Sequence, residues 1–149
     1  MKRYITMLFC FGVLQVSAQQ ISNALPAYYN VKEALISGNE ATVTQRAADL
    51  MHEIEKAAPS VAEPGRSALI SGSRALAGAT SLDKQRSLFA PLSEQMAAAV
   101  KTAHPADTTV YKMYCPMKKA YWLSNEATIR NPYYGKSMLS CGNVAEEIK

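Results

Sequence analysis

Four stretches with apolar residues three and four positions apart occupy residues 23–103, and this spacing constrains the fold more than any other feature of the sequence. Such a period is typical of amphipathic α-helices with one buried face. Segments containing glycine or proline separate the stretches and end each periodic run. The pattern predicts helices over residues 23–37, 41–58, 66–79 and 82–103.

Four amphipathic helices with short connections pack most simply as an antiparallel four-helix bundle. We interpret the leucine and methionine stripes as its core rather than as a cofactor-binding box. Pro91 should kink or split the last helix, because proline removes one hydrogen bond and clashes with the preceding turn. The side chains predicted to be buried include Leu50, Ile54, Leu69, Leu88, Phe89 and Met96.

The first eighteen residues have the order of a secretory signal peptide. A positive start (Lys2, Arg3) precedes an apolar run, and small residues end this run at Ala18, where a signal peptidase would cut. The run is too short for a permanent anchor, and polar residues interrupt every later apolar stretch, so we expect no stable membrane insertion. We predict that residues 1–18 are removed and that one domain, residues 19–149, is periplasmic or secreted.

Charge and motifs exclude several functions. The chain carries +4, and removal of Lys2 and Arg3 with the signal peptide leaves +2, too little for a nucleic-acid interface. The sequence contains no glycine-rich phosphate loop, haem attachment motif or zincin motif. Its two histidines are not near a plausible nucleophile in the sequence. We therefore predict no catalytic residues and no enzymatic activity.

Helical periodicity fades after residue 107, and the chain becomes rich in aromatic and sulfur-containing side chains. The single Trp and five of the eight Tyr lie between positions 111 and 134. Residues 110–114 alternate as a short strand does, which leaves room for one short β-hairpin. Proline and glycine in residues 131–135 indicate a tight turn.

These observations predict two parts of one domain, a helix bundle at residues 22–104 and an irregular C-terminal cap at residues 105–149 folded against one end of it. Aromatic side chains around a tight turn can form a small satellite core. The residues predicted to form this aromatic cap are Trp122, Tyr133 and Tyr134.

The C-terminal motifs resemble the signature of an uncharacterised exported bacterial family. The matching residues are Tyr114-Cys115-Pro116-Met117, Trp122-Leu123, Asn131-Pro132-Tyr133-Tyr134-Gly135, Met138-Leu139 and Cys141-Gly142. Gln85-Arg86, Phe89 and Leu92-Ser93 also match, and the resemblance extends from about Leu25 onward. The family is catalogued only as a domain of unknown function, found alone or fused to periplasmic adaptor subunits of heavy-metal efflux pumps. The resemblance implies a helical domain, an association with copper-type metal handling, and a metal-efflux adaptor or copper carrier as partner, but no activity.

Sulfur side chains are concentrated in the same segment. Soft sulfur ligands select soft ions, and the soft ion expected for an exported bacterial protein is Cu(I), with Ag(I) as its mimic. Zinc is a weaker alternative, because the spacing lacks paired Cys-x-x-Cys elements and would need His52 or His104 to converge on the cysteines. The candidate metal ligands are Cys115, Met117, Met138, Cys141 and Met113.

A disulfide between Cys115 and Cys141 is the competing interpretation. Loss of Cys10 with the signal peptide leaves these two cysteines in an oxidising compartment. A bond that closes this loop would stabilise the fold by roughly 3.5 kcal/mol in the loop-entropy model. Free thiols with neither role remain a third alternative, and the methionines could bind Cu(I) with the disulfide closed. The sequence thus favours a metal-binding accessory protein, with a disulfide-stapled interaction module as the alternative.

Overall fold

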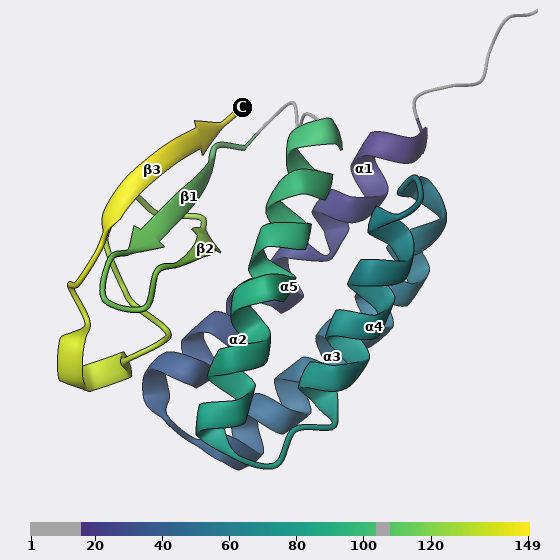
Figure 1. The fold of residues 1–149 in the computed structure, drawn as a ribbon. Helices are drawn as coiled ribbons and strands as arrows, with labels where there is room; N and C mark the ends of the chain where they lie inside the picture. Colours follow the sequence, from purple (N-terminus) through teal and green to yellow (C-terminus); the bar gives the residue numbers. More distant parts are fainter. Residues whose placement is uncertain (1–15, 104–107) are drawn as a thin grey trace, which may run out of the picture.

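The structure of the chain is a computed structural model, and it describes residues 16–103 and 108–149. Within these ranges a group of α-helices lies beside a small antiparallel sheet (Figure 1). The prediction of a mainly helical domain is confirmed. The predicted signal peptide falls mostly on residues 1–15, which lie outside the described residues, so its removal stays a prediction.

The four helices predicted from the sequence begin and end within two residues of the expected positions. A further short helix, α1, precedes them and packs against α3 and α5. Among the described helices, none combines the length and apolar character needed to cross a membrane. The helices are α1 (Val16–Asn23), α2 (Leu25–Ser37), α3 (Glu40–Ala57), α4 (Gly65–Ala77) and α5 (Leu82–Ala103), with a 3-10 turn η1 (Ala58–Ser60) after α3.

One apolar core lies between the helices, where α3 packs against α2 and α4, and α4 packs against α5. Leu88 is only half-buried, so its predicted burial is wrong. Its neighbour Phe89 points inward, and one residue turns a helix by about 100°, which leaves Leu88 at the rim of the buried face. The other side chains predicted to be buried are fully enclosed: Leu50, Ile54, Leu69, Phe89 and Met96.

Helix α5 continues through Pro91 without interruption, so the predicted split does not occur. Proline at this position removes the N–H that would bond to the carbonyl of Ser87. Both Pro91 and Ser87 are exposed. Water can therefore satisfy the free carbonyl, which lowers the cost of a proline inside the helix.

The C-terminal segment forms a three-stranded antiparallel sheet in the order β2-β1-β3. The predicted strand and hairpin are present as β1 (Val110–Cys115) and β2 (Ala120–Ser124), with residues 116–119 as the turn between them. The third strand, β3 (Asn143–Ile148), was not predicted, and it forms one edge of the sheet. The description of this segment as an irregular cap is therefore wrong.

The sheet also lies along the side of the helices rather than on one end of them (Figure 1). Strand β2 packs against α5, and a 3-10 turn, η2 (Gly135–Met138), packs against α2. Strand β2 carries Trp122 and Leu123, both buried. The long face of α5 offers such side chains more apolar surface than a helix end does, which explains the lateral position.

A chain of hydrogen bonds joins the helices to β2. The main-chain N–H of Leu123 donates to the Tyr28 hydroxyl at 3.1 Å, and that hydroxyl lies 2.6 Å from the hydroxyl of Ser93. Ser93 in turn donates to the carbonyl of Phe89 at 2.7 Å. With Tyr28 donating to Ser93, both buried hydroxyls of this network have their partners, which stabilises the junction.

A charged cluster forms a second link between α2 and the end of β2. The Lys32 ammonium is buried and donates to the Ser124 hydroxyl at 3.3 Å. It pairs with Glu33 at 3.2 Å, and Glu33 also pairs with Arg130 at 2.7 Å. Because the buried cation has both an anion and a hydroxyl beside it, its desolvation is compensated.

Candidate functional site

The turn between β1 and β2 carries the first sulfur side chain of the site. Cys115 ends β1 and is fully buried. The main-chain N–H of Lys118 points back at its sulfur, with the nitrogen 3.4 Å from Sγ. Lys119 completes the turn in the left-handed conformation, with φ of 54°. The turn therefore directs a main-chain donor at the sulfur of Cys115.

The second cysteine reaches the same place from the segment between η2 and β3. The main-chain N–H of Cys141 donates to the carbonyl of Met138 at 3.1 Å. The Cys141 thiol lies close enough to the Cys115 thiol and to the main-chain N–H of Met117 for both groups to shift its pKa. The structure thus brings the two predicted cysteines together, and a main-chain N–H lies beside each sulfur.

Both cysteines are free thiols in the structure. The disulfide interpretation is therefore not supported by it, although a disulfide and a shared ion both require this proximity. Desolvation raises the pKa of the Cys141 thiol, and the neighbouring Cys115 raises it further, while the Met117 N–H lowers it in part. The metal-free Cys141 thiol consequently holds its proton more firmly than an ordinary cysteine.

Asn131 holds the segment that carries Cys141. Its side chain is buried, and its amide nitrogen donates to the carbonyl of Cys141 at 2.8 Å. Its side-chain oxygen accepts the N–H of Tyr133 at 2.8 Å, and its main-chain N–H donates to the carbonyl of Leu139 at 2.8 Å. One asparagine therefore fixes both ends of the loop that presents the second thiol.

Gly135 and Arg86 attach this loop to the helices. The guanidinium of Arg86 donates to the carbonyls of Pro132 at 3.1 Å and Leu35 at 3.2 Å. Gly135 has φ of +54°, and a Cβ there would lie 2.8 Å from the carbonyl oxygen of Ile36. Only glycine combines this conformation with so close an approach. The position of Cys141 thus depends on α2 and α5 as well as on its own loop.

Gly142 lets the chain pass directly over the central strand after Cys141. A Cβ at Gly142 would lie 2.8 Å from the carbonyl oxygen of Tyr114 and 2.9 Å from the Trp122 ring. Its φ of +147° is also a conformation that side chains disfavour. The glycine that follows Cys141 therefore allows its thiol to reach Cys115.

The three candidate methionines have different surroundings. Met117 is 62% exposed in the β1–β2 turn, and Met138 is 36% exposed at the end of η2. Met113 is fully buried on β1, paired with Trp122 on β2 and Val144 on β3. The first two thioethers lie on the segments that carry the thiols and are accessible to an ion. Met113 forms part of the sheet's core.

The predicted aromatic cap is part of a longer row of rings that continues into the helices. Trp122 and Tyr133 are buried and meet edge to face, with ring centres 6.1 Å apart. Tyr133 contacts Phe89 at 6.2 Å, and Phe89 stacks on Tyr28 at 4.9 Å. The remaining cap residue, Tyr134, is half-buried against the core. The rings thus anchor the sulfur-bearing segment to α2 and α5.

The zinc alternative receives no support from the described residues. His52 lies exposed on α3, whose main neighbours are α2 and α4. In residues 16–103 and 108–149, no three Cys, His, Asp or Glu side chains form a group that could hold an ion. The other predicted zinc ligand, His104, lies outside the described residues. The sulfur donors of the site are therefore two thiols and the exposed thioethers of the two segments that carry them.

Comparison with protein-family models finds a match to the helical part of the chain. Residues 24–108 match the family model described as Protein of unknown function (DUF3347). The match spans more than half of the chain, and the chain belongs to this family. No curated protein and no solved structure matches the chain.

The matched region covers α2 to α5 and ends before β1, so the sulfur motif lies outside it. It includes the α5 residues that hold the two parts of the molecule together. Arg86, for example, donates to the carbonyl of Pro132 in the C-terminal segment at 3.1 Å and to the carbonyl of Leu35 on α2 at 3.2 Å. The family model therefore matches the α5 residues on which the resemblance depends, but it does not cover the C-terminal sulfur motif.

Proposed function

We propose that this protein is an exported, non-catalytic accessory protein of metal homeostasis or efflux that binds Cu(I), or Ag(I) as its mimic, through sulfur. The observation that carries the proposal is the contact between the Cys115 and Cys141 thiols, each faced by a main-chain N–H. The main-chain N–H of Met117 favours the thiolate of Cys141 and so lowers its pKa in part. Metal–sulfur bonds are about 2.3 Å long, so thiols in contact need only a small shift to share one ion.

We assign the thiolate roles by the proximity of the two cysteines and the thioether roles by accessibility. Cys115 and Cys141 supply the thiolates, and Met117 and Met138 supply thioethers from the two flanking segments. Met113 forms a wall of the site, because it is enclosed between strands. A set of thiolates and thioethers without carboxylates prefers a soft ion. The lysines nearby, Lys118 and Lys119, offset the negative charge that two thiolates would bring.

Ligation as thiolates also predicts a pH dependence. The Cys141 thiol must release its proton to bind an ion, and its raised pKa makes that release more costly at neutral pH. The apparent affinity for Cu(I) should therefore rise as pH increases toward the pKa of the thiol. A titration at several pH values measures this slope.

The proposal is tested by titrating Cu(I) into the protein against a competing chelator, with the cysteines reduced and then oxidised. We expect one tightly bound Cu(I) per chain in the reduced protein, lost in Cys115→Ser and Cys141→Ser and weakened in Met138→Leu. Met51→Leu is the matched control, because Met51 is a half-buried methionine on α3. Binding that survives oxidation but fails without Met117 and Met138 would favour thioether ligation alone.

The alternative is a structural or protein-interaction module in which Cys115 and Cys141 form a disulfide. The contact between the two thiols favours this candidate as well, because a bond between them needs little movement. If neither redox form binds Cu(I) or Ag(I) above background, and Cys115→Ser only lowers the Tm, this module replaces the metal-binding proposal.

Export, a four-helix bundle architecture and a periplasmic partner belong to the same proposal. They rest on the order of residues 1–18, on the helical periodicity, and on the resemblance to a family fused to metal-efflux adaptors. The expected partner is such an adaptor or a copper carrier. Mass spectrometry of the protein from its host should find Gln19 at the N-terminus, and a chain that begins at Met1 would contradict export.

A further inference from the structure

The surface around the two thiols carries an unusual excess of positive charge. Between Thr108 and Ala145 the sequence has five basic residues and a single acidic one, Glu126. Two of the basic residues pair with helix carboxylates, Lys112 with Glu94 at 2.9 Å and Arg130 with Glu33 at 2.7 Å. These pairs connect the sheet to the helices and account for part of the charge.

The other three basic residues are exposed lysines on the segments that carry the thiols. Lys118 and Lys119 follow Met117 in the β1–β2 turn, and Lys136 lies on η2 with Met138. Within residues 16–103 and 108–149, none of these three lysines has a carboxylate within ion-pair distance. Nothing in the described structure therefore neutralises them.

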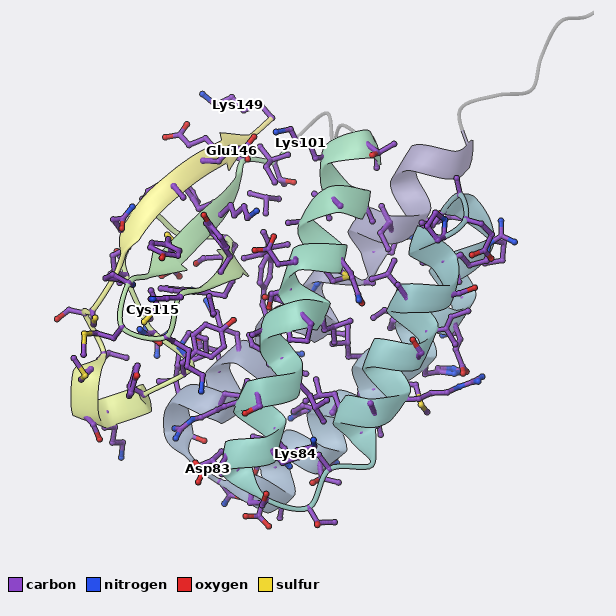
Figure 2. The ribbon with its side chains drawn as sticks, in the orientation of Figure 1. Asp83, Lys84, Lys101, Cys115, Glu146 and Lys149 are labelled. Atoms are coloured by element: carbon purple, nitrogen blue, oxygen red, sulfur yellow. The ribbon has the colours of Figure 1, made fainter. Side chains whose placement is uncertain are left out.

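The same two segments also carry exposed apolar side chains next to these lysines in the sequence. Met117 is 62% exposed, Met138 36% and Leu139 37%. The contact of Cys141 with Cys115 and Met117 holds the two segments side by side, and Figure 2 shows sulfur atoms gathered near Cys115 and η2. We name this region the lysine–thioether surface: Lys118, Lys119, Lys136, Met117, Met138 and Leu139.

An apolar centre with a charged rim is the usual anatomy of a protein interface. Flexible thioether side chains adapt to differently shaped partners, and an unpaired charge of one sign selects the opposite sign and steers its approach. A polybasic site for anionic lipid generally needs about four to eight basic residues, and this surface has three. The composition therefore fits a protein partner better than a membrane.

We propose that the lysine–thioether surface docks an acidic segment of a partner protein that itself carries exposed methionines. Docking would place the partner's thioethers beside Met117 and Met138, where an ion could pass between the two proteins. This transfer of an ion, unlike the docking itself, rests on the proposed soft-metal function. An ion would then pass without change of oxidation state, because one sulfur–ion bond forms on one protein as another breaks on its partner. The protons of the two thiols leave to the solvent as the thiolates bind.

The docking is tested with metal-free protein and two short fluorescent peptides that share methionine pairs. One peptide carries glutamates and the other carries lysines at the same positions. We expect fluorescence anisotropy to show binding of the glutamate peptide at least about tenfold tighter than of the lysine peptide at low salt. That binding should be lost at about 1 M salt, where the Debye length is about 3 Å.

Substitutions locate the contact. The affinity for the glutamate peptide should fall at least about tenfold in a triple variant that combines Lys118→Glu, Lys119→Glu and Lys136→Glu. Lys84→Glu should leave its binding unchanged, because Lys84 is an exposed lysine on the first turn of α5, away from the sulfur site (Figure 2). Circular dichroism of both variants checks that the helices are retained.

Three results would overturn the docking proposal: equal binding of the two peptides, binding that ignores the triple substitution, or tighter binding to vesicles of anionic phospholipid than to the glutamate peptide. Because the measurement uses metal-free protein, it is independent of the Cu(I) titration. A chain that docks the acidic peptide but binds no Cu(I) or Ag(I) overturns the proposed function and the ion transfer, and leaves the docking surface intact.

Discussion

The helical region (residues 16–103) and the C-terminal region (residues 108–149) are stabilised in different ways. In the helical region, periodic apolar side chains from neighbouring helices fill a common core. In the C-terminal region, single residues fix the backbone, as Asn131 does with three hydrogen bonds and Gly135 with its close approach to α2. The first region should therefore tolerate substitution of one residue by another of similar size, whereas the second depends on particular residues.

The two regions nevertheless share a junction, in which Phe89 stacks on Tyr28 and contacts Tyr133. Phe89→Ala should lower the free energy of unfolding by about 3–5 kcal/mol, because it removes a fully buried ring. The helical circular dichroism and the fluorescence of Trp122, the single tryptophan, should report the same transition in denaturant. Leu88→Ala should cost less, since Leu88 is half-buried.

Two separate transitions in that experiment would contradict a shared junction, since they would make the regions independent folding units. A cost below about 1 kcal/mol for Phe89→Ala would also contradict the junction, because a buried aromatic ring rarely costs so little to remove.

Alkaline pH should weaken the same junction. Burial raises the pKa of Tyr28 and of Tyr133 above the ordinary value of 10. Above about pH 10 the unfolded chain loses tyrosine protons that the folded chain keeps, so stability falls as pH rises, by about 1.4 kcal/mol per pH unit for each such tyrosine. Denaturant titrations across this range measure the slope, which should be smaller in Tyr133→Phe.

Gly135→Ala should act mainly on the C-terminal region. The left-handed conformation costs about 1–2 kcal/mol for a residue with a Cβ. That Cβ would also lie 2.8 Å from the Ile36 carbonyl oxygen and 3.0 Å from the Arg86 guanidinium. We expect a loss of at least about 2 kcal/mol in the single transition that Trp122 fluorescence and helical circular dichroism share.

The matched control is Gly78→Ala, at a glycine with φ of −83° where a Cβ would be 3.5 Å from its nearest neighbour. It should change stability by no more than about 1 kcal/mol. An equal loss in both variants would show that Gly135 has no special role.

The smallest effect is expected for the ion pair of Lys101 on α5 with Glu146 on β3. The hydrogen bond from Lys101 lowers the pKa of Glu146, so the pair stabilises the fold above the ordinary carboxyl pKa and is lost as pH falls through the lowered value. Both groups are exposed, and such pairs contribute little. Glu146→Gln should shift the Tm only slightly, and a large shift would mean that this contact joins the two regions more strongly than the aromatic row does.

The helices were predictable because their periodicity is local. The apolar residues of α3 and α5 repeat at helical spacing, and each helix ends near the expected residue. Leu88 shows the limit of this reasoning, because a stripe of apolar residues does not reveal which member lies at its rim. The first helix, α1, was missed, because only Ile21 among its described side chains is buried.

The C-terminal region was less predictable because long-range pairing forms it. Strand β3 has no alternating apolar pattern, and only Ile148 in it is buried. Its strand conformation comes from pairing with β1, which lies about thirty residues earlier in the chain. The resemblance drew attention to Asn131 and Arg86, but their hydrogen bonds to Cys141 and Pro132 could not be read from the sequence.

The residues predicted for the candidate site were brought together only in part. Cys115 and Cys141 meet, and Met117 lies beside them through its main chain. Met113 was included because it is near in sequence, but strand alternation places it in the core of the sheet. The sequence therefore predicts the thiol pair but overestimates the number of accessible sulfur ligands.

Strand β3, as the outer strand of the sheet, has a consequence for association between copies of the chain. An exposed strand edge can pair with another molecule and begin aggregation. Charged side chains (Glu146, Glu147, Lys149) line this edge, and the register with β1 shifts between Lys112 and Met113. Charged side chains at the edge and the register shift both oppose the addition of a further strand. The strand that completes the sheet therefore also protects the chain against growth into fibres.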